Sequence, residues 1–324
     1  MSSSKPVIAL FGATGFLGRN VTPVFTKAAQ EGTIASLRIF SSRPPSDPSL
    51  QVFAGDNVQI LQTNFTSKEE LAQQLQGVNA VVCMLGNQGE ESYRVKDLLL
   101  EALVAAGVQI YVPSEFGADH IATPYGATNT MLTFKRKHTE DSICQGIKTL
   151  SIHNGCFLEI AFCRWFGMDS ANNTYSFVGD GTTPMACTSL NDVAHFTLSA
   201  VLLAHKDPKS VPDKLHVYSA NLTQRQYAQE LDAAAPAGTP PFKIITNPLD
   251  QAKADYEIKR HHIPPHMLGP LLPILAAEGV FDASKSNANE LLNPGGSIWP
   301  IKTFQQYARE VHGRPWKGVD PSFS

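Results

Sequence analysis

One short stretch near the amino terminus constrains the fold more than any other. Residues 7–11 are apolar and are followed by glycines at positions 12, 15 and 18. Glycine lacks the Cβ atom that would block a tight turn, keep a pyrophosphate away from the backbone, or hold a helix away from a strand. The N–H groups at the start of the next helix can then bind an anion. The stretch therefore predicts a buried strand, a glycine turn and a helix that begins near Phe16.

We expect this turn to bind the pyrophosphate of a dinucleotide. The alternative is a tight connection between strand and helix that binds no ligand. The expected contacts come from the glycines and from the residues between them. These are Gly12, Thr14, Gly15, Phe16, Leu17 and Gly18.

The second apolar run, residues 37–42, ends in the sequence that selects the cofactor. In dinucleotide-binding folds an acidic residue about twenty positions after the glycines binds the adenosine ribose, whereas an arginine accommodates a 2′-phosphate. This chain has Ser42 and Arg43 there, and no carboxylate before Asp47. A guanidinium is a planar fork of donors that matches phosphate. The sequence therefore predicts NADPH, with Ser42 and Arg43 at its 2′-phosphate. The alternative is that Arg43 is a solvated loop residue.

Strands and helices continue to alternate along the first half of the chain. Strands are predicted over 58–63, 79–85 and 149–155, with another from 109 to the turn at Pro113, and helices over 67–76 and 92–106. Such alternation is typical of parallel sheets built from right-handed βαβ units. Ligands bind at the carboxyl ends of such strands, so Leu85 and Gly86 are expected beside the cofactor.

The predicted fold class is α/β, a Rossmann-type doubly wound parallel sheet with a smaller, discontinuous and mainly helical substrate domain. The expected cofactor domain spans residues 1–158, and residues 186–220 return to it. The substrate domain then consists of residues 159–185 and 221–324. A group of aromatic residues just after the sheet either lines an apolar substrate pocket or fills the core. They are Phe162, Trp165, Phe166, Tyr175 and Phe177.

Composition argues against several other classes of protein. Hydrophobic residues make up 43% and charged residues 17% of the 324, as in ordinary globular enzymes. The formal net charge is −3 without a long basic run, so no nucleic-acid partner is expected. No apolar run reaches the roughly 18 residues of a membrane span, and the short polar start does not read as a leader, so we expect a cytoplasmic protein. The five cysteines form no Cys-x-x-Cys pair, which argues against a zinc site. The prolines between His262 and His266 prevent the helix that would place these two side chains on one face, so a metal site is not expected there either.

Several short motifs resemble one family of proteins. Besides the glycine turn they are Ala105–Val108, the Pro-Ser-Glu-Phe-Gly segment at 113–117, Gly146-Ile147, Asn154–Phe157, Gly179–Gly181 and Asn191–Val193. Together they are similar to the NmrA-like, isoflavone reductase-like family of atypical short-chain dehydrogenases. The resemblance covers about the first two-thirds of the chain and fades beyond about residue 220.

The resemblance implies a reductase that depends on one lysine. None of the eight tyrosines is followed by Lys four residues later, so the Tyr-x-x-x-Lys pair of many short-chain dehydrogenases is absent. Members of the resembling family have a lysine beside the nicotinamide, about eleven residues before a Gly-Ile pair. Counting back from Gly146 gives Lys135, with Lys137 as the alternative. Such a lysine can move a proton if burial lowers its pKa from about 10.4 toward neutrality.

The resemblance also implies the remaining contacts and the reaction. The other expected cofactor contacts are Pro113, Ser114, Phe116, Lys135, Asn154 and Phe157. The implied reaction is hydride transfer from NADPH to a small, aromatic or phenolic substrate of isoflavone or phenylpropanoid type, by a homodimer. The same family includes regulators that sense NADP and bind a protein partner without turnover, which is the second hypothesis. Lys135 favours the enzyme, because a sensor has no need of it.

Overall fold

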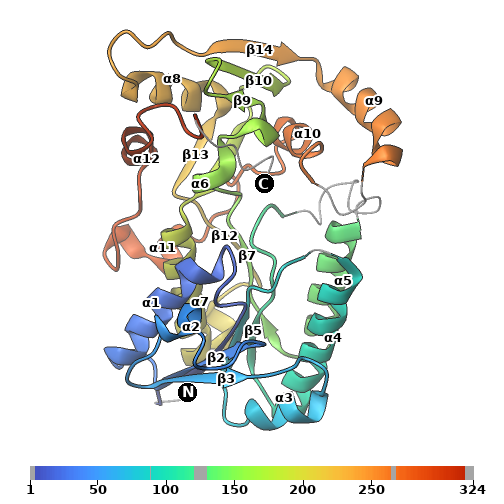
Figure 1. Ribbon diagram of the computed structural model, residues 1–324, viewed down its shortest axis with the longest axis vertical. Coiled ribbons are helices and arrows are strands. Elements are labelled where there is room, and N and C mark those ends of the chain that lie inside the picture. Colours follow the sequence, from blue (N-terminus) through green and yellow to red (C-terminus); the bar gives the residue numbers. More distant parts are fainter. Residues whose placement is uncertain (1–3, 88, 120–129, 264–267, 318–324) are drawn as a thin grey trace.

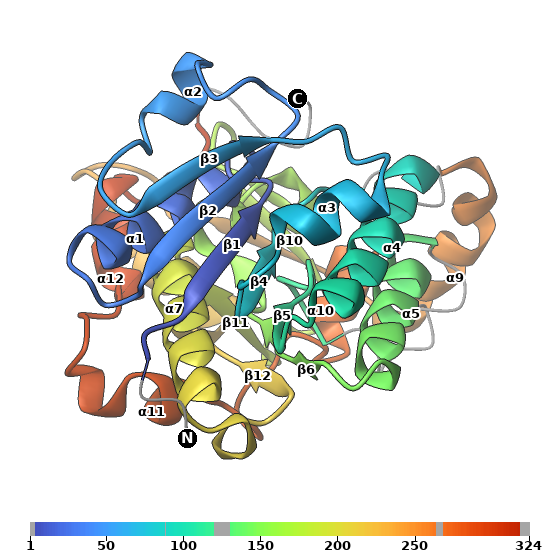
Figure 2. The same ribbon diagram turned by 90° about the horizontal axis from the view of Figure 1, so that it is seen from below.

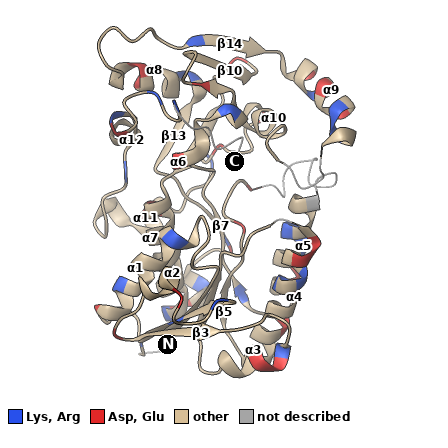
Figure 3. Cartoon of the chain, in the orientation of Figure 1, with Lys and Arg blue, Asp and Glu red and all other residues tan. Residues whose placement is uncertain are grey.

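The computed structural model describes residues 4–87, 89–119, 130–263 and 268–317. In Figure 1 a lower half built on a parallel sheet lies beneath an upper half of small sheets and short helices. Charged residues are spread over both halves, and both acidic and basic residues occur along the helices at the right of Figure 3. None of the helices in the described ranges is long and apolar enough to cross a bilayer.

The lower half is a six-stranded parallel sheet in the order β3-β2-β1-β4-β5-β6. Its strands are β1 (Val7–Phe11), β2 (Ser36–Ser41), β3 (Val58–Gln62), β4 (Ala80–Cys83), β5 (Ile110–Val112) and β6 (Lys148–Thr149). The direction of strand order reverses between β1 and β4, which opens a crevice for ligands at their carboxyl ends. The predicted α/β class with a doubly wound parallel sheet is confirmed.

Helices cover both faces of this sheet (Figure 2). Alternate residues of β1 point to opposite faces, so Ile8 and Leu10 belong to one core and Ala9 and Phe11 to another. The first core packs against α1 (Gly18–Gln30) and α7 (Leu190–Lys206), and the second against α3 (Lys68–Gln74) and α4 (Gly89–Ala106). α4 begins three residues before its predicted start. α2 (Pro48–Gln51) and α5 (Thr130–Cys144) complete this half.

The strand predicted over residues 149–155 is divided in the structure. β6 ends at Thr149, and β7 (Ser151–His153) pairs with β12 (Lys214–His216). The N–H of Leu150 donates to Tyr111 O at 2.8 Å on one side, and the N–H of Ser151 donates to Asp213 O at 2.7 Å on the other. The segment therefore joins β5 along one edge and β12 along the other.

The upper half holds two three-stranded sheets and several helices. The sheets are β14-β10-β9 and β13-β11-β8, made of β8 (Cys156–Phe157), β9 (Met168–Asp169), β10 (Thr174–Val178), β11 (Pro184–Thr188), β13 (Ala220–Thr223) and β14 (Lys243–Asn247). The helices of this half are α6 (Leu158–Ala161), α8 (Gln224–Ala234), α9 (Leu249–Lys259), α10 (Leu272–Ala277) and α12 (Phe304–Glu310), with the short 3-10 turns η3 (Arg164–Phe166) and η5 (Arg260–His262). The 3-10 turn η4 (Pro208–Ser210) and helix α11 (Asn289–Leu292) instead contact α7 of the lower half, and the 3-10 turn η6 (Pro294–Gly296) contacts α11.

Two domains with the predicted boundaries remain our proposal. A separate core fills the upper half, and it contains Phe162, Tyr175 and Phe177. Residues of α7 and β12 instead belong to the core of β1 and α1. This sharing supports a return of the segment around 190–216 to the cofactor domain.

Candidate functional site

The glycine turn has the geometry that the sequence predicts. Gly12 has φ +85°, and a Cβ atom on it would lie 2.7 Å from the Met84 carbonyl. A Cβ on Gly18 would lie 1.9 Å from Gly12 O, so glycine is required where α1 meets the end of β1. α1 begins at Gly18, two residues after Phe16, because residues 15–17 form the turn that leads into it. Leu17 supplies no side-chain cap, so its side chain does not compete with an anion at this end. The amides of Arg19 and Asn20 donate to Gly15 O and Leu17 O within the turn.

Two aromatic rings bring the glycine turn into contact with β8. Phe16 is 41% exposed, and its ring packs edge to face on Phe157 at 5.6 Å between centroids. Phe157 lies in β8, which is part of the β13-β11-β8 sheet. The structure thus brings together Phe16 and Phe157, two predicted cofactor contacts that lie near opposite ends of the first domain in the sequence.

Arg43 lies in the loop after β2, beside α2. Its guanidinium donates to Ser49 Oγ at 2.8 Å and lies 3.8 Å from an Asp47 carboxylate oxygen. The Ser49 side chain is also the main cause that lowers the pKa of Asp47. Ser42 is exposed beside it.

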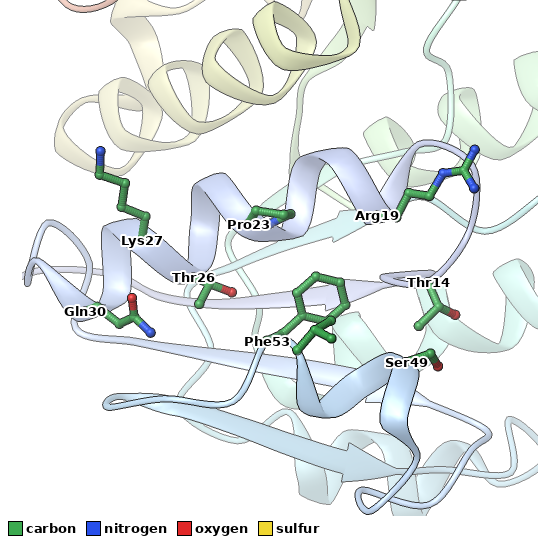
Figure 4. A pocket seen from close by; sticks show the side chains of 9 residues that line it. Thr14, Arg19, Pro23, Thr26, Lys27, Gln30, Ser49 and Phe53 are labelled. Atoms are coloured by element: carbon green, nitrogen blue, oxygen red, sulfur yellow. The ribbon is translucent and has the colours of Figure 1, made fainter.

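A groove of about 550 Å³ runs beside α1 next to this loop. Figure 4 shows Thr14 and Arg19 at one end of the groove, with Ser49 of α2 beside them. Thr14 was an expected contact, whereas Arg19 was not identified from the sequence. The signal for Arg19 was a basic residue directly after the third glycine, in the first turn of α1.

Two loops at the carboxyl ends of β4 and β5 are hydrogen-bonded to each other. Ser114 Oγ donates to Leu85 O at 2.8 Å, and Asn87 Nδ2 is 3.5 Å from Ser114 O. Pro113 is buried in the second loop, and Gly86 lies between Leu85 and Asn87 in the first. These contacts hold the predicted residues of both loops together at the carboxyl ends of β4 and β5.

Lys135 lies on α5 and faces a cavity of about 250 Å³. Its Nζ donates to the backbone oxygen of Glu115, which anchors the ammonium at the end of the Pro-Ser-Glu-Phe-Gly loop. Burial lowers the pKa of Lys135, and the Glu115 carboxylate opposes part of this shift. Lys137 is exposed and forms an ion pair with Asp141, so it does not reach the cavity. The geometry supports Lys135 over Lys137 as the reactive lysine.

The cavity is lined mainly by apolar side chains from both halves of the molecule. Its walls include Phe116, Met131, Leu132, Cys156, Phe157, Ile160, Trp165, Phe166, Leu268, Leu272, Leu275 and Phe281. Of the aromatic residues expected either to line a pocket or to fill the core, Trp165 and Phe166 line this cavity, whereas Phe162, Tyr175 and Phe177 are buried in the upper core. The wall from the last third of the chain was not identified from the sequence, because apolar residues there do not differ from core residues.

Asn154 carries polar atoms that the protein itself does not satisfy. It is 0% exposed at the end of β7, and neither Oδ1 nor Nδ2 has a hydrogen-bond partner among the described residues. A buried amide without partners costs stability unless a ligand or water completes it. Together with the glycine turn, this amide fits a pyridine nucleotide that carries its own carboxamide and ribose groups. The described residues hold no cluster of side chains suited to a metal ion.

Three comparisons place this geometry among known proteins. The model of the NmrA-like family matches residues 4–221. A protein named isoflavone reductase homolog IRL, from Zea mays, is 32% identical over 235 residues, which are 67% of this chain and 70% of that protein.

Solved structures with the same fold cover almost the whole chain. A structure described as AtPrR2 with NADP+ and (+)pinoresinol has a TM-score of 0.74 at 18% identity and covers 96% of this chain and 99% of that one. A crystal structure of isoflavone reductase has a TM-score of 0.74 at 17% identity, with 95% and 99% covered. The leucoanthocyanidin reductase–NADPH complex from Vitis vinifera has a TM-score of 0.70 at 18% identity, with 94% and 98% covered.

Proposed function

Because this chain belongs to the NmrA-like family, we propose that it is an NADPH-dependent reductase of a small, aromatic or phenolic substrate. The observation that carries the proposal is Lys135, a lysine of lowered pKa that faces an apolar cavity. One wall residue of this cavity, Phe157, packs on Phe16 of the glycine turn. The names of the maize relative and of the similar structures, several of them reductases, support the same reaction class.

The chain's own residues would bind NADPH along the crevice of the sheet. The amide groups at the start of α1 would bind the pyrophosphate, and Arg43 would bind the 2′-phosphate in exchange for its present partners Ser49 and Asp47. The side-chain amide of Asn154, which has no partner among the described residues, would form hydrogen bonds with the nicotinamide end of the nucleotide. When bound, NADPH supplies the hydride that reduces the substrate.

Lys135 would hold and move the proton of the reaction. A lowered pKa increases the neutral fraction of the amine at a given pH, which favours exchange of a proton with the substrate. Its hydrogen bond to Glu115 O fixes Nζ at the cavity wall. The apolar walls around it exclude water and would pack against an aromatic ring.

The proposal is tested by NADPH oxidation with a panel of phenylpropanoid, isoflavone and quinone-like compounds. We expect turnover with at least one aromatic compound, at the expense of NADPH. Tight binding of NADP+ without turnover of any compound would instead support the regulatory hypothesis, in which the chain senses the nucleotide and binds a protein partner.

Replacing Arg43 tests the choice of cofactor separately. Arg43→Ala is expected to raise the Kd for NADPH by about ten- to a hundredfold, because a charged hydrogen bond to phosphate is lost. The Kd for NADH is expected to change little. Titration of both nucleotides against wild type and variant measures this, and a wild-type preference for NADH would refute the assignment.

A further inference from the structure

Lys96 is a buried lysine that the proposed mechanism does not use. It lies on α4 and is only 2% exposed. Its Nζ donates to Asn87 Oδ1 and lies 4.9 Å from the centroid of the Tyr93 ring. Burial lowers the pKa of Lys96 to about 8. A buried ammonium costs stability that a neutral side chain of similar size would avoid. A buried lysine with a lowered pKa is therefore a candidate for a functional role.

Both contacts of Lys96 lead to the cavity that Lys135 faces. Asn87 lines that cavity itself. The Tyr93 hydroxyl donates to Asn87 O at 3.0 Å and is 3.4 Å from Met131 O on α5. The Tyr93 ring also stacks on Phe134, next to Lys135, at 4.4 Å between centroids. Lys96 therefore contacts the cavity wall through Asn87, and it contacts α5, which carries Lys135, through Tyr93.

We propose that Lys96 is a positioning residue for Lys135. Its ammonium holds Asn87 in the cavity wall and places a second positive charge behind Lys135, which favours the neutral amine there. The positive charge of Lys135 contributes to the lowered pKa of Lys96. We infer that the same repulsion also acts on Lys135, since two like charges in a site with little water disfavour each other. This inference rests on the proposed function for its effect on turnover, but not for its effect on Lys135 itself.

Other titratable groups also face the two lysines. The groups that face them are Cys83 on β4, Tyr93 and Asp97 on α4, Glu115 after β5 and, through Asp97, His138 on α5. Burial raises the pKa values of Cys83 and Tyr93, so both stay neutral below about pH 8. Glu115 opposes the repulsion, and its carboxylate accepts a hydrogen bond from Thr139 Oγ1 at 2.6 Å. Asp97 is hydrogen-bonded to His138 at 3.3 Å.

The reactivity of the Lys135 amine tests the inference without any turnover. Competitive acetylation by acetic anhydride, read by mass spectrometry, reports the neutral fraction of each lysine, with exposed Lys285 as the internal reference. In Lys96→Gln the hydrogen bond to Asn87 can be kept while the charge is lost. We expect acetylation of Lys135 near pH 7 to fall about threefold or more, because the loss of a nearby positive charge favours the protonated amine.

Two further variants and a control complete the design. Lys96→Arg keeps the charge and is expected to preserve the wild-type reactivity of Lys135. Lys96→Met removes both charge and hydrogen bond, and serves also if the glutamine variant does not fold. Lys68→Gln removes an exposed lysine that pairs with Glu101 of α4 at 3.5 Å, and should leave Lys135 unchanged. Unchanged acetylation of Lys135 in the folded glutamine or methionine variant would overturn the inference.

Turnover gives a second readout with a distinct signature. In Lys96→Gln the pH profile of kcat/KM is expected to move to higher pH, whereas Lys96→Met should in addition raise the KM for the substrate, because Asn87 is no longer held. If the wild type reduces none of the compounds while acetylation responds as expected, the proposed function fails and the coupling of the two lysines stands. If turnover is observed and its pH profile stays unchanged in both variants, the inference fails alone.

Discussion

Lys135→Met is expected to lower kcat by about a hundred- to ten-thousandfold, the usual contribution of a positioned proton donor or acceptor. The thioether cannot move a proton, whereas its length and apolar character suit the cavity walls around it. The Kd for NADPH should stay within about threefold of wild type, since the glycine turn and Arg43 would bind most of the nucleotide. Single-turnover oxidation of NADPH, combined with equilibrium titration of the nucleotide, separates the two effects.

Lys137→Met is the matched control for this result. Lys137 is on the same helix, is exposed and pairs with Asp141, so its loss should leave kcat close to wild type. Near-normal turnover in Lys135→Met together with inactivity in Lys137→Met would mean that the other lysine is the reactive one.

Gly18→Ala is expected to prevent folding or to lower the free energy of unfolding by on the order of 3 kcal/mol or more. The added Cβ would lie 1.9 Å from Gly12 O and 2.7 Å from the Ala13 carbonyl carbon. These are backbone atoms at the junction of β1 and α1, so no side chain can move to relieve the contact. Urea unfolding of the variant, or its recovery in soluble form, measures the effect.

Gly15→Ala is the comparison within the same turn. Its Cβ would lie 3.3 Å from Gly12 O, and its φ is not in the left-handed region, so the fold should persist. The methyl group would instead stand where the pyrophosphate approaches, and we expect NADPH binding to weaken by on the order of tenfold or more. A Gly18→Ala variant as stable as the wild type, or unchanged NADPH affinity in Gly15→Ala, would argue against this account of the turn.

The parts of the fold that depend on neighbouring residues could be predicted from the sequence. The strand at 7–11, the glycine turn and the cap at Ser67, whose Oγ accepts from Glu70 N at 3.1 Å, follow from local chemistry. The division of the strand at Leu150 could not be predicted, since it depends on residue 213, far along the chain. Pairing partners of that kind are set by tertiary contacts.

The site, too, could be predicted only in part. The glycine turn could be predicted from the spacing of its glycines, and Lys135 from the family resemblance. Lys96 looks like an ordinary charged residue of a helix, and only the packing of α4 against the loops after β4 and β5 shows that it is buried. The cavity wall at Leu272 and Phe281 belongs to the last third of the chain, and only the fold brings it to the sheet.

A crystal structure of the protein grown with NADP+ tests the central claim most directly. The account predicts density for the pyrophosphate at the amide groups that begin α1, the 2′-phosphate on Arg43, and the nicotinamide in contact with Lys135 and Asn154. A nucleotide bound elsewhere, or a Lys135 side chain that points away from the nicotinamide in the complex, would contradict it.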